Sequence, residues 1–303
     1  MSDVVVTLGV FDGVHRGHRH IFEKVVARAR RRHGLSLVYT FEPHPACLLA
    51  PLSAPPMLNN LAQKRELIAE AGIDRIVVER FTRSFSAITP DRFFHRILVR
   101  RLRAREIFVG HDFTFGVHRS GTTDDLRTMG KEAGVQVHVV PAYLWKETLV
   151  SSTQIRHFVA QGQLRAAEDL LGRPYFIEGR VIRGRGIGGK KLGIHTANIA
   201  PENDSILPTG VYATTTVVGG KRYSSVTNIG PNPTFGPGPL SIETHILKFN
   251  RSIFRRRIRI EFLEKLREEI TFASAEELAR QIHHDIDLAQ KVFAGRRDHR
   301  HHR

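Results

Sequence analysis

The chain has 303 residues, of which 41% are hydrophobic, and a formal net charge of +16 at pH 7. This length accommodates two domains with separate cores, and the composition is typical of a soluble globular protein. The single cysteine, Cys47, excludes an internal disulfide framework and favours a reducing compartment. No apolar run reaches membrane-spanning length and no basic flank precedes the N-terminal one, so we expect a cytoplasmic protein without a signal peptide.

The positive charge is concentrated in basic clusters at residues 28–32, 100–105 and 255–259. Part of this charge can attract anionic nucleotides by long-range steering. Because no zinc-finger, homeodomain or RNA-recognition signature accompanies it, solvated Arg-rich surfaces are favoured over a nucleic-acid-binding face. The His- and Arg-rich tail, residues 296–303, is expected to be disordered.

Residues 9–18, GVFDGVHRGH, interrupt two regular patterns. An apolar run at residues 4–10 leads into them, and apolar residues at helical spacing follow them. The pattern predicts a strand, a glycine-bent turn and the start of a helix. Glycine lets the backbone approach a ligand closely, and a helix start favours an anion.

His15 and His18 add two side-chain donors at this helix start, which completes a pattern typical of phosphate binding. A metal site formed with His20 is disfavoured, because no cysteine or third well-spaced carboxylate joins the histidines.

The rest of the first 172 residues alternates between strand and helix patterns. Predicted strands lie at 35–41, 75–79, 107–109 and 135–140, and predicted helices at 61–71, 89–103 and 124–133. Such alternation favours a parallel sheet with helices on its faces. Ligands of these sheets bind beyond the carboxyl ends of the strands, where residues 9–18 fall.

Two further segments are predicted at the same edge. Residues 110–116, GHDFTFG, follow a predicted strand, and residues 151–156, SSTQIR, begin a helix. The hydroxyl side chains of SSTQIR can be simple helix caps. Arg156, one turn into that helix, can alternatively clamp a phosphate with two hydrogen bonds.

From about Gly172 the pattern changes to short strands rich in β-branched residues. These strands are predicted at 175–183, 211–218, 221–228, 240–249 and 257–263, and a helix is predicted at 273–292. The order indicates an antiparallel barrel or sandwich closed by one C-terminal helix. We therefore expect domains at residues 1–172 and 173–295, followed by the tail.

Residues 184–198, GRGIGGKKLGIHTAN, partly match two nucleotide-binding motifs. Gly184, Gly186 and Gly189 fit GxGxxG, and Lys190 extends the match toward a P-loop. Both motifs require a helix immediately afterwards, and no apolar helical face follows. Lys191 also stands where a P-loop has Ser or Thr, so neither motif is accepted.

Several of these segments together resemble one family. FDGVHRGH resembles the HxGH motif of nucleotidyltransferases in the form seen in bacterial bifunctional riboflavin kinase/FAD synthetases. GHDFTFG and SSTQIR are similar to that family's G(E/D)(D/N)FxFG and SSTxIR segments, and residues 184–198 to its GxxxGRxLGxPTAN loop. The resemblance implies a Rossmann-like α/β HxGH nucleotidyltransferase domain, followed by an antiparallel β-barrel riboflavin kinase domain with a C-terminal helix.

In the first domain, the resemblance implies that His15 and His18 hold the triphosphate of ATP, with Arg156 as a further catalytic residue. Contacts to the nucleotide or flavin are implied for Gly9, Phe11, Asp12, Gly17, Asp112, Ser151, Ser152 and Thr153. One departure is His111, which stands where the family usually carries an acidic residue.

In the second domain, the resemblance implies that Glu243 is the catalytic base and that Thr196 and Asn198 serve Mg²⁺. Ligand contacts are implied for Gly184, Gly186, Lys190, Lys191, Gly193 and Asn228. Phosphorylating a primary hydroxyl requires a group that takes its proton. A lone glutamate in a strand can also be an exposed ion-pair partner, so the assignment depends on its neighbours.

The implied function is FAD biosynthesis from riboflavin. ATP-dependent phosphorylation would give FMN, and adenylylation of FMN by a second ATP would give FAD and pyrophosphate. His195 replaces the Pro of PTAN, and the glycine loop is one residue longer than usual. A relative with only the adenylyltransferase half active therefore stays open, as does a non-catalytic basic nucleic-acid-binding relative. The oligomeric state is also open.

Overall fold

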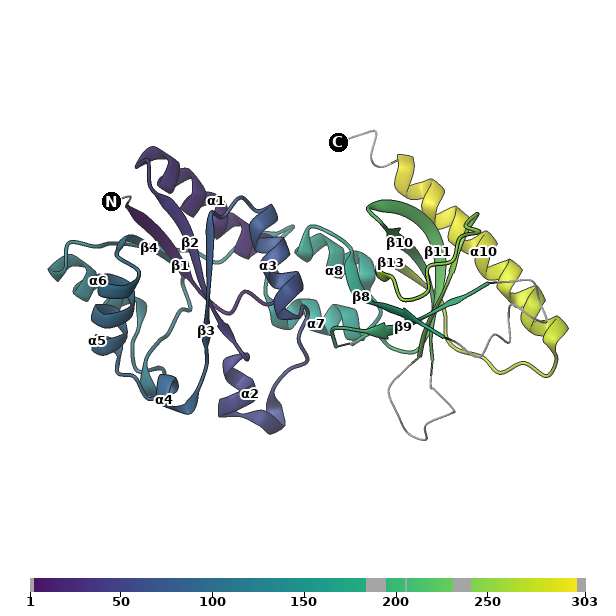
Figure 1. The fold of residues 1–303 in the computed structure, drawn as a ribbon, viewed down its shortest axis with the longest axis horizontal. Coiled ribbons are helices and arrows are strands. Elements are labelled where there is room, and N and C mark those ends of the chain that lie inside the picture. Colours follow the sequence, from purple (N-terminus) through teal and green to yellow (C-terminus); the bar gives the residue numbers. More distant parts are fainter. Residues whose placement is uncertain (1–2, 184–194, 205, 231–240, 299–303) are drawn as a thin grey trace. The chain divides into compact units, whose positions relative to one another are not determined.

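The computed structural model describes residues 3–183, 195–204, 206–230 and 241–298. It divides into two compact units, Met1–Ser152 and Thr153–Arg303 (Figure 1). The division falls before the boundary expected near Gly172. The helix α8 (Leu164–Leu171) accounts for this, since it packs against strands of the second unit.

The first unit contains the expected parallel sheet. Its strand order is β3-β2-β1-β4-β5, and every neighbouring pair is parallel. The strands are β1 (Val4–Leu8), β2 (Leu35–Glu42), β3 (Arg75–Arg80), β4 (Ala104–Gly110) and β5 (Gln136–Val140). Because β1 lies in the middle, the segment that follows it reaches the centre of the carboxyl edge.

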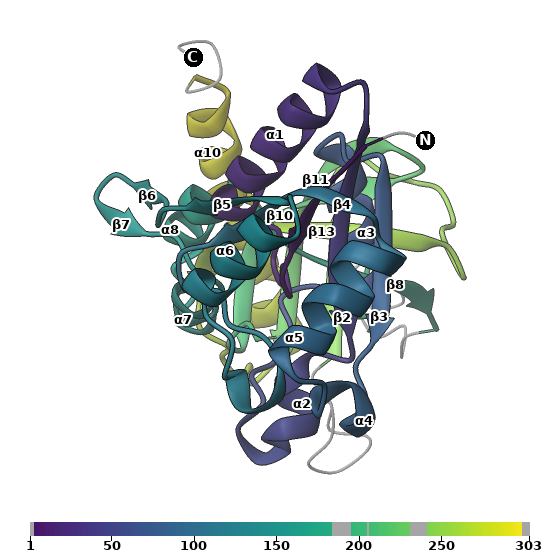
Figure 2. The ribbon, with the colours of Figure 1, turned by 90° about the vertical axis from the view of Figure 1, so that its left-hand side faces the viewer.

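Helices cover both faces of this sheet. Figure 1 shows α1 and α3 on one side and α5 and α6 on the other, and Figure 2 looks onto the face covered by α5 and α6. The helices are α1 (Arg16–Arg31), α3 (Leu61–Glu70), α5 (Pro90–Arg92) and α6 (Thr123–Glu132). Helix α1 buries Ile21, Phe22, Val25 and Ala29, which confirms the apolar stripe predicted for it.

The helix predicted at residues 89–103 forms with a different geometry over most of its length. After α5 the chain continues as a π-helix, Phe93–Arg101, that buries Phe93, Phe94 and Leu98. The amide of Leu102 donates to the carbonyl of Ile97 at 2.9 Å, which is the five-residue spacing of a π-helix. Side-chain periodicity alone does not distinguish these two helix types.

Several short elements were not predicted. They are α2 (Pro45–Leu49), α4 (Arg83–Ser86), two 3₁₀ turns at Pro51–Ser53 and Val117–Arg119, and a hairpin of β6 (Leu144–Trp145) and β7 (Thr148–Leu149). Each is too short to establish a hydrophobic period. The hairpin matters for the site, because the guanidinium of Arg16 stacks 3.8 Å above the Trp145 ring.

The second unit is a closed six-stranded barrel in the order β10-β11-β12-β9-β8-β13. Its strands are β8 (Tyr175–Ile182), β9 (Ala197–Pro201), β10 (Gly210–Val218), β11 (Lys221–Gly230), β12 (Ser241–Ile246) and β13 (Arg257–Arg267). All their pairings are antiparallel, as expected. Strand β9 was not predicted, and its first two residues were assigned to the glycine-rich loop.

One long helix, α10 (Ala275–Asp298), packs on the outside of the barrel. Val211, Ala213 and Val226 of the outer face meet Ala289 in one buried apolar cluster. The helix includes residues 296–298, the first three of the tail that was expected to be disordered. Arg296, one of them, forms an ion pair with Glu168. Residues 299–303 lie outside the described residues.

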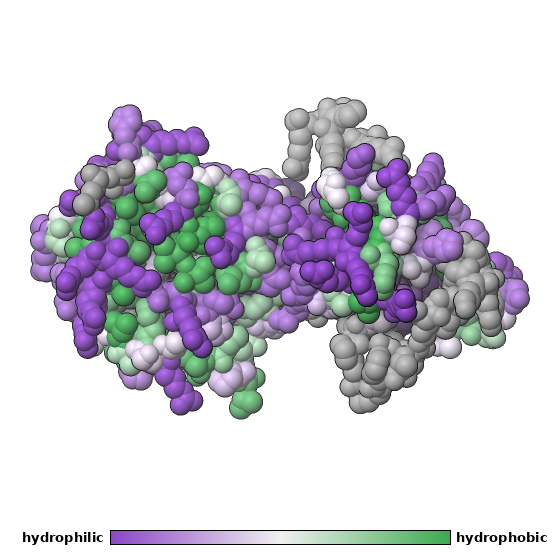
Figure 3. All heavy atoms as spheres, viewed as in Figure 1, coloured by the Kyte–Doolittle hydropathy of each residue, from purple (hydrophilic) through white to green (hydrophobic). Residues whose placement is uncertain are grey.

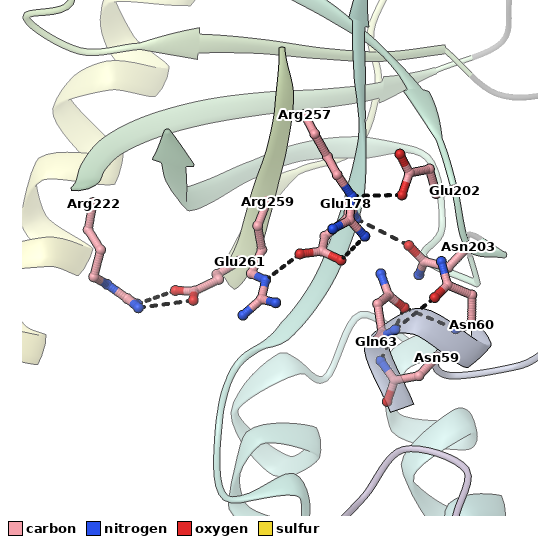
Figure 4. Close-up of polar contacts among 10 residues, drawn as sticks. All are labelled: Asn59, Asn60, Gln63, Glu178, Glu202, Asn203, Arg222, Arg257, Arg259 and Glu261. Carbon is pink, nitrogen blue, oxygen red and sulfur yellow. Dashed lines mark hydrogen bonds and ion pairs between the residues drawn. The ribbon is translucent and has the colours of Figure 1, made fainter. Parts of the chain in front are cut away.

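Carboxylates neutralise part of two basic clusters. Arg28 and Arg32 both bind Glu106, whose side chain has no exposed surface. On the barrel, Arg257 and Arg259 bind the two oxygens of Glu178 at 2.9 and 2.8 Å (Figure 4). These pairs give a structural reason for arginine at those positions that involves no nucleic acid.

Hydrophobic and hydrophilic residues are mixed on the surface. On the face seen in Figure 3, hydrophobic residues of the first unit lie exposed between hydrophilic ones. Among the described residues, no helix is both long and apolar enough to cross a membrane.

Two candidate active sites

The loop between β1 and α1 adopts an unusual backbone conformation. Phe11, Gly13 and Val14 have φ angles of 53°, 80° and 39°. Glycine adopts this region freely, whereas a β-branched residue such as Val14 is strained there. The side chains of Phe11 and Val14 are buried, at 3% and 1% exposure, so packing holds the strained turn in place. Strain maintained in this way is typical of functional sites.

His15 and His18 lie together at the start of α1. The Nδ1 atom of His15 accepts a hydrogen bond from the His18 backbone N–H at 3.3 Å, which caps the helix. A neutral His15 therefore carries its proton on Nε2. The two imidazole rings stack with centroids 3.5 Å apart, and a side chain at Gly17 would meet the His15 ring at 3.3 Å. The motif thus places two imidazoles where the helix dipole favours an anion.

Phe11 packs against His18, and Gly9 leaves room for the Phe11 ring. The Phe11 ring packs edge-on against the rings of His18 and Phe22, at centroid distances of 5.1 and 5.0 Å. A Cβ atom on Gly9 would lie only 2.8 Å from the Phe11 ring. Both residues therefore help to fix the orientation of His18, and a ligand contact from either stays a prediction.

Asp12 joins separate segments of the first unit. Its carboxylate accepts hydrogen bonds from the amides of Leu58 and Asn59 at 3.1 and 3.2 Å, and the residue is 2% exposed. The hydroxyl of Ser152 donates to the Asp12 carbonyl at 2.8 Å. The structure thus brings the start of SSTQIR to the FDGVHRGH loop, as expected for one site.

Lys64, on α3, is a buried charged residue that sequence reasoning missed. It is 4% exposed, and burial lowers the pKa of its ammonium, with the charges of Glu42 and Asp12 opposing that shift. Its spacing from Leu67 and Ile68 placed it on the apolar stripe of α3, which was the available signal. Buried lysines with shifted pKa values are enriched at functional sites.

The remaining predicted residues of this half lie as follows. Asp112 is exposed just beyond β4, which neighbours β1, so it lies at the same sheet edge as the loop. Ser151 directly precedes α7 (Ser152–Ala160), and Thr153 and Arg156 lie on that helix. The compact-unit division places Thr153 and Arg156 in the second unit.

The barrel brings Glu243, Asn198 and Asn228 together. Glu243 of β12 is the direct cross-strand partner of Asn198 on β9 and of Asn228 on β11. Directly opposed residues on neighbouring strands have Cβ atoms about 5 Å apart. All three side chains are half-buried, and Glu243 alternates with the buried Ile242 and Thr244. A carboxylate flanked by two amides therefore lies on the outer face of the barrel.

A cavity of about 430 Å³ is lined by Ala197 and Thr244, the chain neighbours of Asn198 and Glu243, and not by the row itself. Its apolar walls include Val181, Ile246, Phe249, Ile253 and Phe254. His195 and Thr196 also line it, and the Nδ1–H of His245 donates to the His195 carbonyl at 2.8 Å. Strand β12 thus holds the segment that carries Thr196, through a residue two positions from Glu243.

The other residues predicted for this half cannot be placed. Gly184, Gly186, Lys190, Lys191 and Gly193 lie outside the described residues.

The two units together define a class of protein. A parallel α/β unit with paired histidines at a helix start is joined to an antiparallel barrel with a carboxylate row. Family comparisons divide the chain in the same way, since residues 1–154 match the FAD synthetase family and residues 171–293 the riboflavin kinase family.

Whole-chain comparisons agree. The bifunctional riboflavin kinase/FMN adenylyltransferase of Escherichia coli K12 is 37% identical over 95% of this chain and 92% of its own length. The Haemophilus influenzae protein of the same name is 33% identical, over 97% and 95%. The chain therefore belongs to the bifunctional riboflavin kinase/FMN adenylyltransferase family.

A solved structure supports the fold. A crystal structure from Streptococcus pneumoniae, described as a macrolide-efflux protein, matches with a TM-score of 0.86 and 28% identity. The match covers 95% of this chain and 94% of that one.

Proposed function

We propose that this chain makes FAD from riboflavin in two ATP-dependent steps, one at each site. The barrel transfers the γ-phosphate of ATP to riboflavin and releases FMN. The α/β unit transfers AMP from a second ATP to FMN and releases pyrophosphate. The observation that carries the proposal is the presence, in one chain, of a histidine pair suited to an anion and a carboxylate suited to a hydroxyl nucleophile.

Adenylyl transfer needs positioning more than proton transfer. The attacking oxygen belongs to the phosphate of FMN, which is already anionic at neutral pH. It forms a bond to the α-phosphorus of ATP while the bond to the bridging oxygen breaks and pyrophosphate leaves. His15, with its proton on Nε2, and His18 stabilise charge on the phosphates at the start of α1. The family motif adds the guanidinium of Arg156 as a source of positive charge.

Kinase chemistry needs a base, because the primary hydroxyl of riboflavin must lose its proton as it attacks the γ-phosphorus. Glu243 accepts that proton in this proposal. Asn198 and Asn228 lie on either side of it and orient the reacting groups through hydrogen bonds. The bond from the γ-phosphorus to the bridging oxygen breaks, and ADP leaves.

The cavity lined by Thr244, the residue after Glu243, accommodates the base of ATP in this proposal. Phe249, Phe254 and three aliphatic side chains offer apolar walls for a planar ring. His195 and Thr196 line the same cavity, and in this proposal the phosphates attached to that base lie toward them.

The oxygen atoms of Thr196 and Asn198 suit Mg²⁺, which prefers hard oxygen ligands and is usually held by one or two protein groups together with substrate phosphates. Bound there, the ion would neutralise charge on the transferred phosphoryl group. In this proposal Thr196 and Asn198 hold it.

A second candidate function is adenylyl transfer alone. It is favoured by His195, which stands beside Thr196 in the cavity and replaces the proline of the family motif. One experiment separates the two candidates. The purified chain is incubated with riboflavin, ATP and Mg²⁺ and the flavins are then separated. FMN and FAD together support the bifunctional proposal. FAD formed only from supplied FMN supports the alternative, and no FAD from either flavin contradicts both.

A further inference from the structure

The interior of the barrel contains an unexpected row of hydroxyl groups. In the described part of the barrel, five inward-facing hydroxyl side chains have no solvent exposure. They are Thr214 and Thr216 on β10, Ser225 and Thr227 on β11, and Thr244 on β12. On the same strands the outward-facing Val211, Ala213 and Val226 pack beneath α10. Over part of their length, β10 and β11 are therefore polar inside and apolar outside.

The hydroxyl groups form one continuous network. Thr214 is within 2.8 Å of both Ser225 and Thr227, and Thr216 is within 2.8 Å of Ser225. Thr227 donates to Thr244 at 2.9 Å, and Ser225 also donates to the Thr214 carbonyl. Every member has a partner, so the cost of burying five hydroxyls is offset.

Such a network differs from an apolar core in one respect. Valine has nearly the shape of threonine and packs equally well in a barrel interior, but its contacts depend little on direction. Hydrogen bonds between fixed strands are directional, and they are satisfied in only one register. A one-residue slip of a strand would also reverse which side chains face outward. The network therefore fixes the relative positions of β10, β11 and β12.

The Thr227–Thr244 bond lies directly behind the reacting row. Thr227 and Thr244 are direct cross-strand partners, and so are the next residue on β11 and the preceding one on β12, Asn228 and Glu243. Because successive side chains on a strand point to opposite faces, the hydroxyl pair lies inside the barrel and the Asn228–Glu243 pair outside. The pair of hydroxyls thus joins the two backbone segments that carry the outer pair.

We propose that Thr227 and Thr244 are positioning residues of the kinase reaction, which hold Glu243 at the distance and angle required to accept the riboflavin proton. This inference rests on the proposed role of Glu243. A general base must lie within hydrogen-bond reach of the proton it removes, and small displacements of a reacting group reduce rates steeply. The hydroxyl pair acts on Glu243 through the backbone of β12; Thr244 also lines the proposed nucleotide cavity, whereas Thr227 does not.

The test uses Thr244→Val, which preserves shape and removes the bond from Thr227. We expect kcat for FMN formation to fall about tenfold while KM for ATP and riboflavin changes less than about twofold. Thr244→Ser restores the hydroxyl and should return kcat to within about twofold of the original. Adenylylation of supplied FMN is unaffected in both.

Ser225→Ala is the matched control. It removes a buried hydroxyl with three hydrogen bonds from the same network, but leaves the Thr227–Thr244 bond in place. It should lower the unfolding midpoint of the barrel at least as much as Thr244→Val and leave kcat within about twofold. Thr227→Val removes the same bond from a residue that does not line the cavity, so it is measured in parallel and replaces Thr244→Val if that variant does not fold. A loss of kcat in Thr244→Val that Thr227→Val does not share would overturn the proposal.

Equal losses of kcat in Ser225→Ala and Thr244→Val would overturn the proposal, since the network would then act on stability alone. Full kcat in Thr244→Val would overturn it as well. Glu243→Gln is measured alongside. If that variant keeps its kinase rate, the assignment of the base fails, which is distinguishable from a failure of the positioning residues.

Discussion

The two candidate sites differ in the kind of backbone that carries their functional side chains. The first lies on an irregular loop, where three residues of positive φ within a four-residue stretch and a helix start bring two imidazoles together. The second lies on regular antiparallel strands, where cross-strand pairing alone places a carboxylate between two amides. The difference follows the nucleophiles. An anionic phosphate needs positive charge and backbone donors around its target, whereas a hydroxyl needs a base at a fixed distance.

The two sites also differ in what holds them in position. The loop depends on local packing, in which Phe11, Gly9 and Gly17 fit closely around the histidines. The barrel row depends on strand register, which the buried hydroxyl network fixes from inside. Damage to one site should therefore leave the other active, and substitutions at each site test that separation.

The largest expected effect is that of Glu243→Gln on the kinase. Glutamine preserves size and hydrogen bonding but cannot take a proton, so FMN formation should fall about 10³-fold. Adenylylation of supplied FMN should continue at the original rate. Separate assays of FMN and FAD formation measure both steps. An unchanged kinase rate would give Glu243 a structural role and remove the chemical basis for the comparison.

His18→Ala makes the reciprocal test in the first unit. Loss of one charge-stabilising donor should lower FAD formation about 10²- to 10³-fold and leave FMN formation measurable. His20→Ala is the control, because His20 lies on the same helix and its ring meets only Tyr143 among the aromatic contacts of the described residues. FAD formation at the original rate in His18→Ala would contradict the nucleotidyltransferase site.

Sequence reasoning anticipated which segments of the first candidate site meet, because the chain order and the spatial order agree there. Parallel strands end at one edge, so the FDGVHRGH loop and the start of SSTQIR could be expected to meet, and the Ser152–Asp12 bond confirms it. Lys64 was missed because hydrophobic periodicity identifies the buried stripe of a helix from its apolar residues and gives no role to a single polar residue on that stripe. The φ angles of Phe11 and Val14 were also beyond prediction, since local propensity disfavours them.

For the second site, the resemblance indicated Asn198, Asn228 and Glu243, whose roles stay predictions, but it did not give their geometry. No strand was predicted at β9, and its first two residues were assigned to the glycine-rich loop. Without β9, the direct pairing of Asn198 with Glu243 could not be derived. The hydroxyl network could not be predicted either, because alternation alone predicts an apolar barrel interior, whereas part of the outer face of β10 and β11 is apolar here and is covered by α10. Long-range pairing, not local pattern, decides both features.

A smaller effect is expected when Glu106 is changed, and it should be confined to the first unit. Burial alone would raise the pKa of Glu106, but hydrogen bonds from Arg28 and His138 and the charges of Arg28 and Arg32 lower it overall. Glu106→Gln should destabilise the first unit by about 2 kcal/mol, because it leaves these cations without a buried counter-charge.

The pH dependence of that effect follows from the lowered pKa. A carboxyl whose pKa is lowered on folding stabilises above its unfolded value of 4.5, and the contribution is lost as pH falls through the lower folded value. The difference in unfolding temperature between the original protein and Glu106→Gln should therefore become smaller as the pH is lowered from neutral into that acid range. An equal shift of the barrel transition would contradict the independence of the two units.

The smallest expected effect is that of His195→Pro, which restores the family residue beside Thr196. Proline keeps the backbone carbonyl, so the hydrogen bond from His245 can remain, and it fixes φ before the oxygen ligands proposed for Mg²⁺. A smaller ordering cost of 0.4 to 1 kcal/mol, the usual order of magnitude for such a substitution, would lower KM for MgATP about two- to fivefold.

His195→Ala is the control, because it removes the imidazole without fixing φ. Kinase rates of all three proteins are compared from about pH 6 to about pH 8, the range in which an imidazole can change charge. If both variants are slower than the original throughout, His195 itself contacts the nucleotide, and the departure from the family motif is an adaptation of this site. If only the proline variant is slower, the backbone at residue 195 has a conformation that proline cannot adopt. A gain confined to the proline variant supports our expectation that ordering of this backbone limits MgATP binding.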